Sequence, residues 1–298
     1  NVYHHPENAK DGILQFGHSK NHRSDLLQFK QGLAVLDPAG VPMLSETLAG
    51  NRADDPCYLP AWRRMVATIG NPDFLYIADC KAASHETRST IDHEKGYYLF
   101  PLPMTGDTPG HLKELVLDSA QAHQKIVLEP KANQDGQART VGEGFVVNKQ
   151  MEAHFDNGVA HQWQERWMVT CSHAHAKRQK KSFNNRLNQA ETKLAKIKPK
   201  KEETVESFRE RAEKILQTHN VKNYFYLEVN ESITTKKKYI GRGRPGPKTP
   251  FEIVELRNLK LLAHRDEELI DQFRKLAGWR IYVTNVAEDR MTLNQSTQ

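Results

Sequence analysis

The chain has 298 residues and a net charge of +6, a length that allows one large domain or two smaller ones. Hydrophobic residues make up 38% and charged residues 27%, so a core can form under a polar surface, while no apolar run is long enough for a membrane-spanning helix. The three cysteines are widely spaced, which argues against a disulfide framework or a zinc site and suits a reducing cytoplasm.

The first hundred residues predict an α/β protein. Turn residues 37–40 separate two apolar runs, and a helical period of apolar residues follows. A short apolar run after Pro72 is predicted to be a buried strand in parallel pairing. The predicted order is strand, strand, helix, strand, helix, strand: Leu26–Leu36, Val41–Leu48, Tyr58–Ile69, Phe74–Ala78, Ser84–His93 and Tyr97–Leu102. We expect the four strands to share one sheet, with the helix Tyr58–Ile69 packed on it.

Beyond Pro103 the pattern changes. Asn157-Gly158 is a strong hairpin signal, and the next apolar residues repeat at the spacing of two helices packed as an antiparallel pair with their lysines outward. The predicted strands are Phe145–Phe155, Val159–Cys171, Tyr224–Val229, Ile253–Leu262 and Trp279–Thr284, and the predicted helices are Phe183–Ile197, Val205–Leu216 and Asp266–Ala277.

Asp79 is the sharpest candidate for chemistry. It directly follows the predicted strand Phe74–Ala78, and in open α/β sheets active sites gather at the carboxyl ends of strands. A carboxylate there can hold a hard divalent cation, and two such ions can clamp the attacking and leaving oxygens of a phosphoryl displacement. An Asp after a strand is also a common turn or cap residue, and this alternative stays open.

Positive charge is concentrated between His173 and Lys248, where 20 Lys and Arg stand against 8 Asp and Glu. Such a segment is typical of a surface that binds nucleic acid, although it also fits a solvated helical surface. Its Arg-Gly-Arg-Pro core is similar to an AT-hook, whose arginines enter the minor groove of A·T-rich DNA. The candidate DNA-binding residues are Lys20 and Arg23 in an early polar loop, and Lys236, Lys237, Lys238, Arg242 and Arg244.

Four ordered blocks resemble the insertion-sequence transposases with a DDE catalytic domain. They are Gly17-His18-Ser19-Lys20 with His22-Arg23 and Asp25-Leu26, then Gly50-Asn51-Arg52-Ala53-Asp54, then Tyr76-Ile77-Ala78-Asp79, and Gly278-Trp279-Arg280-Ile281-Tyr282-Val283-Thr284-Asn285. The resemblance runs over almost the whole sequence.

The resemblance implies an incomplete RNase H-like core of mixed sheet in residues 1–103. Residues 104–298 would be a large α+β insertion that contains the basic helical hairpin. In this family three carboxylates bind two Mg²⁺ ions, and water and then a 3′-hydroxyl attack phosphodiester bonds. Asp79 falls on the second carboxylate. The first would lie upstream of Asn1 and the Glu beyond Gln298, while Glu252 and Glu255 lie in a strand-like stretch and are poor substitutes.

We therefore expect a fragment of a DNA transposase that is inactive alone and binds no Mg²⁺ by itself. The resemblance further implies that the intact protein is a homodimer that acts on transposon ends and target DNA in a prokaryotic cytoplasm, near the nucleoid. Two alternatives remain open at this point: a basic DNA- or RNA-binding protein without catalysis, and a metal-dependent nuclease with the same core.

Overall fold

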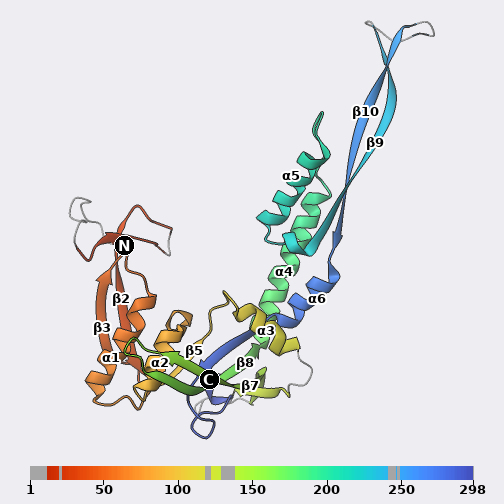
Figure 1. Cartoon of the computed structure of the whole chain (residues 1–298). Helices are drawn as coiled ribbons and strands as arrows, with labels where there is room; N and C mark the ends of the chain where they lie inside the picture. Colours follow the sequence, from red (N-terminus) through yellow and green to blue (C-terminus); the bar gives the residue numbers. More distant parts are fainter. Residues whose placement is uncertain are drawn as a thin grey trace. The chain divides into compact units, whose positions relative to one another are not determined.

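The computed structural model describes residues 12–19, 22–117, 122–128, 138–240, 246 and 249–297. Over these residues the protein is mixed α/β, with six α-helices, one curled six-stranded mixed sheet and two small antiparallel sheets (Figure 1). The chain divides into two compact units, residues 1–171 with 279–298 (unit 1) and residues 172–278 (unit 2). No helix in the described ranges has the length and apolar character needed to cross a membrane.

The six-stranded sheet is the centre of unit 1. Its strands are, in spatial order, β4 (Leu75–Ile77), β5 (Tyr97–Pro101), β11 (Trp279–Thr284), β8 (Ala160–Ser172), β7 (Arg139–His154) and β6 (Gln124–Leu128). The pair β4–β5 is parallel, as predicted, and β11 is antiparallel to both β5 and β8. β7 and β8 meet at the predicted Asn157-Gly158 turn, where Gly158 has a φ of 80° that a side chain would strain.

The expectation that all four N-terminal strands share one sheet is wrong. β2 (Leu27–Leu36) and β3 (Val41–Ala49) form a separate antiparallel sheet with the short β1 (Gln15–Phe16). The physical reason is that no strand among the described residues pairs with both β2 and β4 and so joins the two sheets. β4 is the last strand of the larger sheet. β4 is therefore an edge strand and not a buried one, with Tyr76 buried but Leu75 and Ile77 exposed.

Two helices position the start and end of β4. α1 (Tyr58–Ile69) buries Trp62 and Met65, and it ends where the sequence predicted, at Gly70, whose φ of 85° makes it a left-handed cap. α2 (His85–His93) begins at Ser84, whose hydroxyl accepts from the backbone N–H of Thr87. A third helix, α3 (Thr108–Leu117), has no counterpart among the predicted elements.

Unit 2 contains the predicted helix pair. α4 (His173–Leu194) and α5 (Val205–Thr218) pack on each other around Phe183, Leu187 and Leu216, all at most 1% exposed. α6 (Glu267–Leu276) adds Ile270 to the same core. The lysines of α4 are exposed to solvent, as predicted.

The last two strands of unit 2 are much longer than predicted. β9 (Phe225–Tyr239) and β10 (Phe251–Arg265) pair over fifteen rows as an isolated two-stranded ribbon (Figure 1). Only the end near Phe225 packs on the helical core, through residues such as Leu227, Leu261 and Ala263. The ribbon then continues beyond the helices of its own unit.

The boundary between the compact units differs from the expected division between residues 103 and 104. Strands β8 and β11 come from the stretch expected to be an insertion, yet they pair in the same sheet as β4 and β5. Only residues 172–278 separate as a unit of their own, and these include the helix pair and the ribbon.

Replacing Leu187 by Ala tests the helix pair. The side chain is fully buried, so its loss leaves a cavity, and we expect the free energy of unfolding of unit 2 to fall by about 2–5 kcal/mol. Gln189→Ala on the exposed face of the same helix is the matched control and should change stability by less than about 0.5 kcal/mol. Hydrogen exchange of α4 and α5 amides measures both, and equal protection in the two variants would contradict the packing.

Candidate functional site

Asp79 lies where β4 ends, on the surface of unit 1. Its side chain is exposed, and its Oδ1 accepts hydrogen bonds from the Tyr58 hydroxyl at 2.7 Å and the Lys81 backbone N–H at 2.9 Å. The second bond makes Asp79 the N-cap of the 3-10 turn η3 (Cys80–Ala83). The cap role named as an alternative is therefore present, and Oδ2 makes no hydrogen bond with any residue described in the structure.

Tyr58 keeps its proton in this arrangement. Burial and the neighbouring Asp79 carboxylate raise the pKa of Tyr58 far above its usual range. Burial is also the main reason that the pKa of Tyr76 rises to about 12, with Asp79 contributing. Both phenols are neutral at physiological pH, so the Tyr58 hydroxyl acts as a donor and fixes the orientation of the Asp79 carboxylate.

The other carboxylates near this turn are already paired with lysines. Asp54 accepts from Lys30 Nζ at 2.7 Å, and Asp55 lies 3.1 Å from Lys81 Nζ. Within the described ranges no group of three His, Cys, Asp or Glu side chains is placed to hold a metal ion. Among the described residues near this turn, Asp79 is the one carboxylate that is not paired with a lysine side chain, and a Mg²⁺ ion requires more oxygen ligands than one carboxylate provides.

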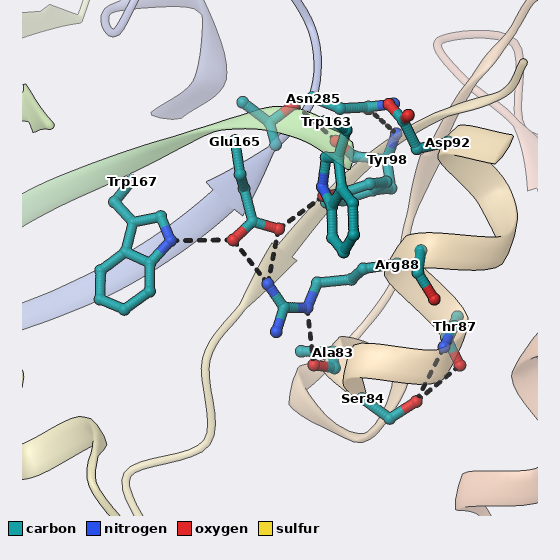
Figure 2. A network of polar contacts seen from close by, with 12 residues as sticks. Ala83, Ser84, Thr87, Arg88, Asp92, Tyr98, Trp163, Glu165, Trp167 and Asn285 are labelled. Atoms are coloured by element: carbon teal, nitrogen blue, oxygen red, sulfur yellow. Dashed lines mark hydrogen bonds and ion pairs between the residues drawn. The ribbon is translucent and has the colours of Figure 1, made fainter. Parts of the chain in front are cut away.

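A buried polar network supports the segment that follows Asp79 (Figure 2). Arg88 of α2 donates from Nε to the carbonyl oxygen of Ala83, the last residue of η3, at 3.0 Å. Its Nη1 lies 2.5 Å from both carboxylate oxygens of Glu165 in β8. Glu165 is completely buried and also accepts from the Tyr98 hydroxyl and from Trp167 Nε1. The network thus connects η3, α2, β5 and β8.

Thr284 and Asn285, in the block Gly278–Asn285, also make hydrogen bonds to β5 and α2. The Thr284 hydroxyl donates to the Tyr98 carbonyl oxygen at 2.5 Å, and Asn285 accepts from the Tyr98 backbone N–H at 3.1 Å. Asn285 Nδ2 also donates to Asp92 of α2 at 2.8 Å. The block Tyr76-Ile77-Ala78-Asp79 and the block that ends at Asn285 therefore both lie beside β5.

The early loop provides a partly neutralised cation. The Arg23 guanidinium makes two hydrogen bonds to the Asp25 carboxylate, at 2.8 and 2.7 Å, and both side chains are exposed. This pairing reduces the charge that Arg23 can offer to a phosphate. Lys20 lies outside the described residues.

The structure places Lys236, Lys237 and Lys238 in β9, beyond the end of the strand Tyr224–Val229 predicted there, and all three are exposed. Arg242 and Arg244 fall outside the described residues. Asp79 and these lysines belong to different units.

Sequence reasoning missed the side chains that hold the Asp79 segment. Tyr58 was predicted only as a residue at the start of a helix, and Arg88 and Glu165 were not selected at all. One signal was available for Glu165. It lies two residues from both Trp163 and Trp167 along a strand, so the three side chains project to the same, buried face.

The sequence matches no protein-family model and no curated protein.

Replacing Arg88 by Met tests the buried network. It leaves the Glu165 carboxylate buried without its cation, so we expect a loss of about 3–5 kcal/mol in the free energy of unfolding. Arg63→Met is the matched control, because it breaks an exposed ion pair with Glu94 and should cost less than about 1 kcal/mol. Denaturant midpoints compare the two, and similar losses would show that the network does not stabilise unit 1.

Proposed function

We propose that this chain is part of a DDE-type DNA transposase, in which Asp79 is one of three carboxylates of the strand-cutting centre. The other two carboxylates and Mg²⁺ would join Asp79 in a longer protein that contains this sequence. The intact protein would act as a homodimer on transposon ends and target DNA, in a prokaryotic cytoplasm near the nucleoid.

The position of Asp79 is the observation that carries this proposal. The carboxylate is exposed at the carboxyl end of a strand in parallel pairing, where α/β enzymes assemble their sites. Tyr58 and the Lys81 N–H fix one oxygen while the other has no partner among the described residues. A supported carboxylate with one free oxygen is the kind of group that a preorganised site requires.

Two free strand edges also support the proposal. In the described part of the chain β4 pairs only with β5, and beyond Gln28 the side of β2 that faces away from β3 has no partner strand. One additional strand between β2 and β4 would join the two sheets in the order β3, β2, added strand, β4, β5. That is the strand order of an RNase H-like core, in which the first catalytic Asp belongs to the central strand.

A second candidate is a DNA- or RNA-binding protein without catalysis. It is favoured by the capping role of Asp79 and by the excess of positive charge in unit 2. The two candidates differ in whether Asp79 is needed for chemistry, and the next experiment separates them.

A plasmid nicking assay tests the catalytic proposal. We expect a longer protein that contains this sequence to nick DNA in the presence of Mg²⁺, and Asp79→Asn to abolish the activity because an amide lacks the charge that binds the cation. Asp73→Asn is the matched control, since Asp73 is an exposed aspartate at the other end of β4 that pairs with Arg290. If Asp79→Asn is as active as Asp73→Asn, Asp79 is only a cap residue.

The basic segment yields a separate prediction about DNA affinity. Each phosphate that a protein cation neutralises contributes about −0.9 to the slope of log affinity against log salt. We expect Arg242→Ala with Arg244→Ala to reduce that slope by up to about 2 and to weaken any preference for A·T-rich DNA. Fluorescence anisotropy with A·T-rich and G·C-rich duplexes measures both effects, and an unchanged slope would exclude these arginines from the interface.

A further inference from the structure

The ribbon β9–β10 has two chemically different faces. Residues directly opposite each other in an antiparallel pair project to the same side, and successive rows alternate. The rows Tyr239/Phe251, Lys237/Ile253, Thr235/Glu255, Ile233/Arg257 and Glu231/Leu259 define face A. The rows Lys238/Glu252, Lys236/Val254, Thr234/Leu256, Ser232/Asn258 and Asn230/Lys260 define face B.

Contacts between side chains agree with this assignment. On face A, Tyr239 and Phe251 are in edge contact, and Lys237 Nζ lies 4.4 Å from the centre of the Phe251 ring. Arg257 forms an ion pair with Glu231 on the same face. On face B, Asn258 Nδ2 donates to the Thr234 hydroxyl at 2.9 Å. None of these contacts crosses from one face to the other.

Over these ten rows the net positive charge of the ribbon lies on face B. The remaining five rows, at the end near Phe225, add Glu228 to face B and Arg265, which pairs with Glu191, to face A. Over the ten rows face A has two cations and two carboxylates, and its cations are engaged with an aromatic ring and a carboxylate. Face B has Lys236, Lys238 and Lys260 against Glu252 alone. No ion pair of these three lysines occurs among the described residues, and their side chains are exposed. Face B also contains hydrogen-bonding side chains: Asn230, Ser232, Thr234 and Asn258.

We propose that face B lies in the major groove of duplex DNA, with face A turned away from the DNA. The major groove of B-DNA, about 12 Å wide, admits a two-stranded ribbon. From Lys238 to Asn230 the strand extends about 27 Å at 3.4 Å per residue, a length of about eight base pairs. The lysines would neutralise phosphates, and the asparagine amides have the donors and acceptors that base edges recognise. This inference rests on the proposal that the protein acts on DNA, and it adds which surface binds it.

The three neighbouring lysines provide a test with an internal control. Lys236→Gln, Lys237→Gln and Lys238→Gln each remove one charge from adjacent exposed positions, but only the second changes face A. We expect Lys236→Gln and Lys238→Gln each to reduce the salt slope by about 0.9 and the affinity at 0.1 M salt by about eightfold. Lys237 was grouped with the other two lysines by sequence, but its row belongs to face A, which is turned away from the DNA in this arrangement. Lys237→Gln should therefore bind a 20-base-pair duplex as the unchanged chain does. Circular dichroism checks that all three variants fold.

Each other outcome overturns the inference. Equal losses in the three variants would mean that the ribbon attracts DNA by charge without a preferred face. A loss confined to Lys237→Gln would assign binding to face A, and no loss in any variant would remove the ribbon from the interface. A duplex RNA of the same sequence separates the two nucleic acids, because its deep and narrow major groove excludes a ribbon. An equal face-specific loss with RNA would therefore exclude docking in the DNA major groove.

Failure of this inference and failure of the catalytic proposal are distinguishable. Binding to the duplex needs neither Mg²⁺ nor Asp79, so the pattern among the three lysines is independent of the nicking assay. Face-specific binding without any Mg²⁺-dependent nicking of plasmid would leave a DNA-binding protein that uses the ribbon.

Discussion

Unit 1 depends on the buried carboxylate of Glu165. A charge that is fully removed from water is costly unless every lone pair has a donor, and the donors come from three different elements: Arg88 of α2, Tyr98 of β5 and Trp167 of β8 itself. The arrangement is consistent only with a protonated Tyr98, whose pKa burial and Glu165 raise well above its usual range. Because Arg88 also holds the end of η3, the placement of Asp79 follows from this pair.

The parts of the fold that were predictable are those decided by neighbouring residues. The stop of α1 at Gly70, the Asn157-Gly158 turn and the stripe that buries Leu187 depend on backbone preferences and spacing within a few turns. Sheet membership was not predictable, because it depends on partners such as Leu99 and Thr284, which are far apart in the sequence. The ribbon was underestimated for another reason: with both faces exposed near Lys236, the strand has no buried face to produce an apolar alternation.

The candidate site also combines a residue that its neighbours in sequence reveal with residues that depend on distant partners. Asp79 could be selected because it follows a short apolar strand, a pattern visible in five residues. Its donor Tyr58 lies 21 residues earlier, and nothing in the local sequence indicates that the two meet. Arg88 and Glu165 are separated by 77 residues and resemble ordinary surface charges when each is considered alone. Long-range pairing converts them into the most deeply buried ion pair described in unit 1.

Residues 172–278 are inserted between the paired strands β8 and β11, and the two ends of this segment lie side by side. The backbone N–H of Ser172 donates to the carbonyl oxygen of Gly278 at 3.2 Å, and the adjacent residues Cys171 and Trp279 form the first row between β8 and β11. Once residues 172–278 have folded, their two ends are already together. The entropic cost of closing a loop of that length then does not oppose the pairing of β8 with β11. The two strands meet as a hairpin whose turn is a whole folded unit. The inserted sequence can therefore change in length without altering the pairing of the strands beside it.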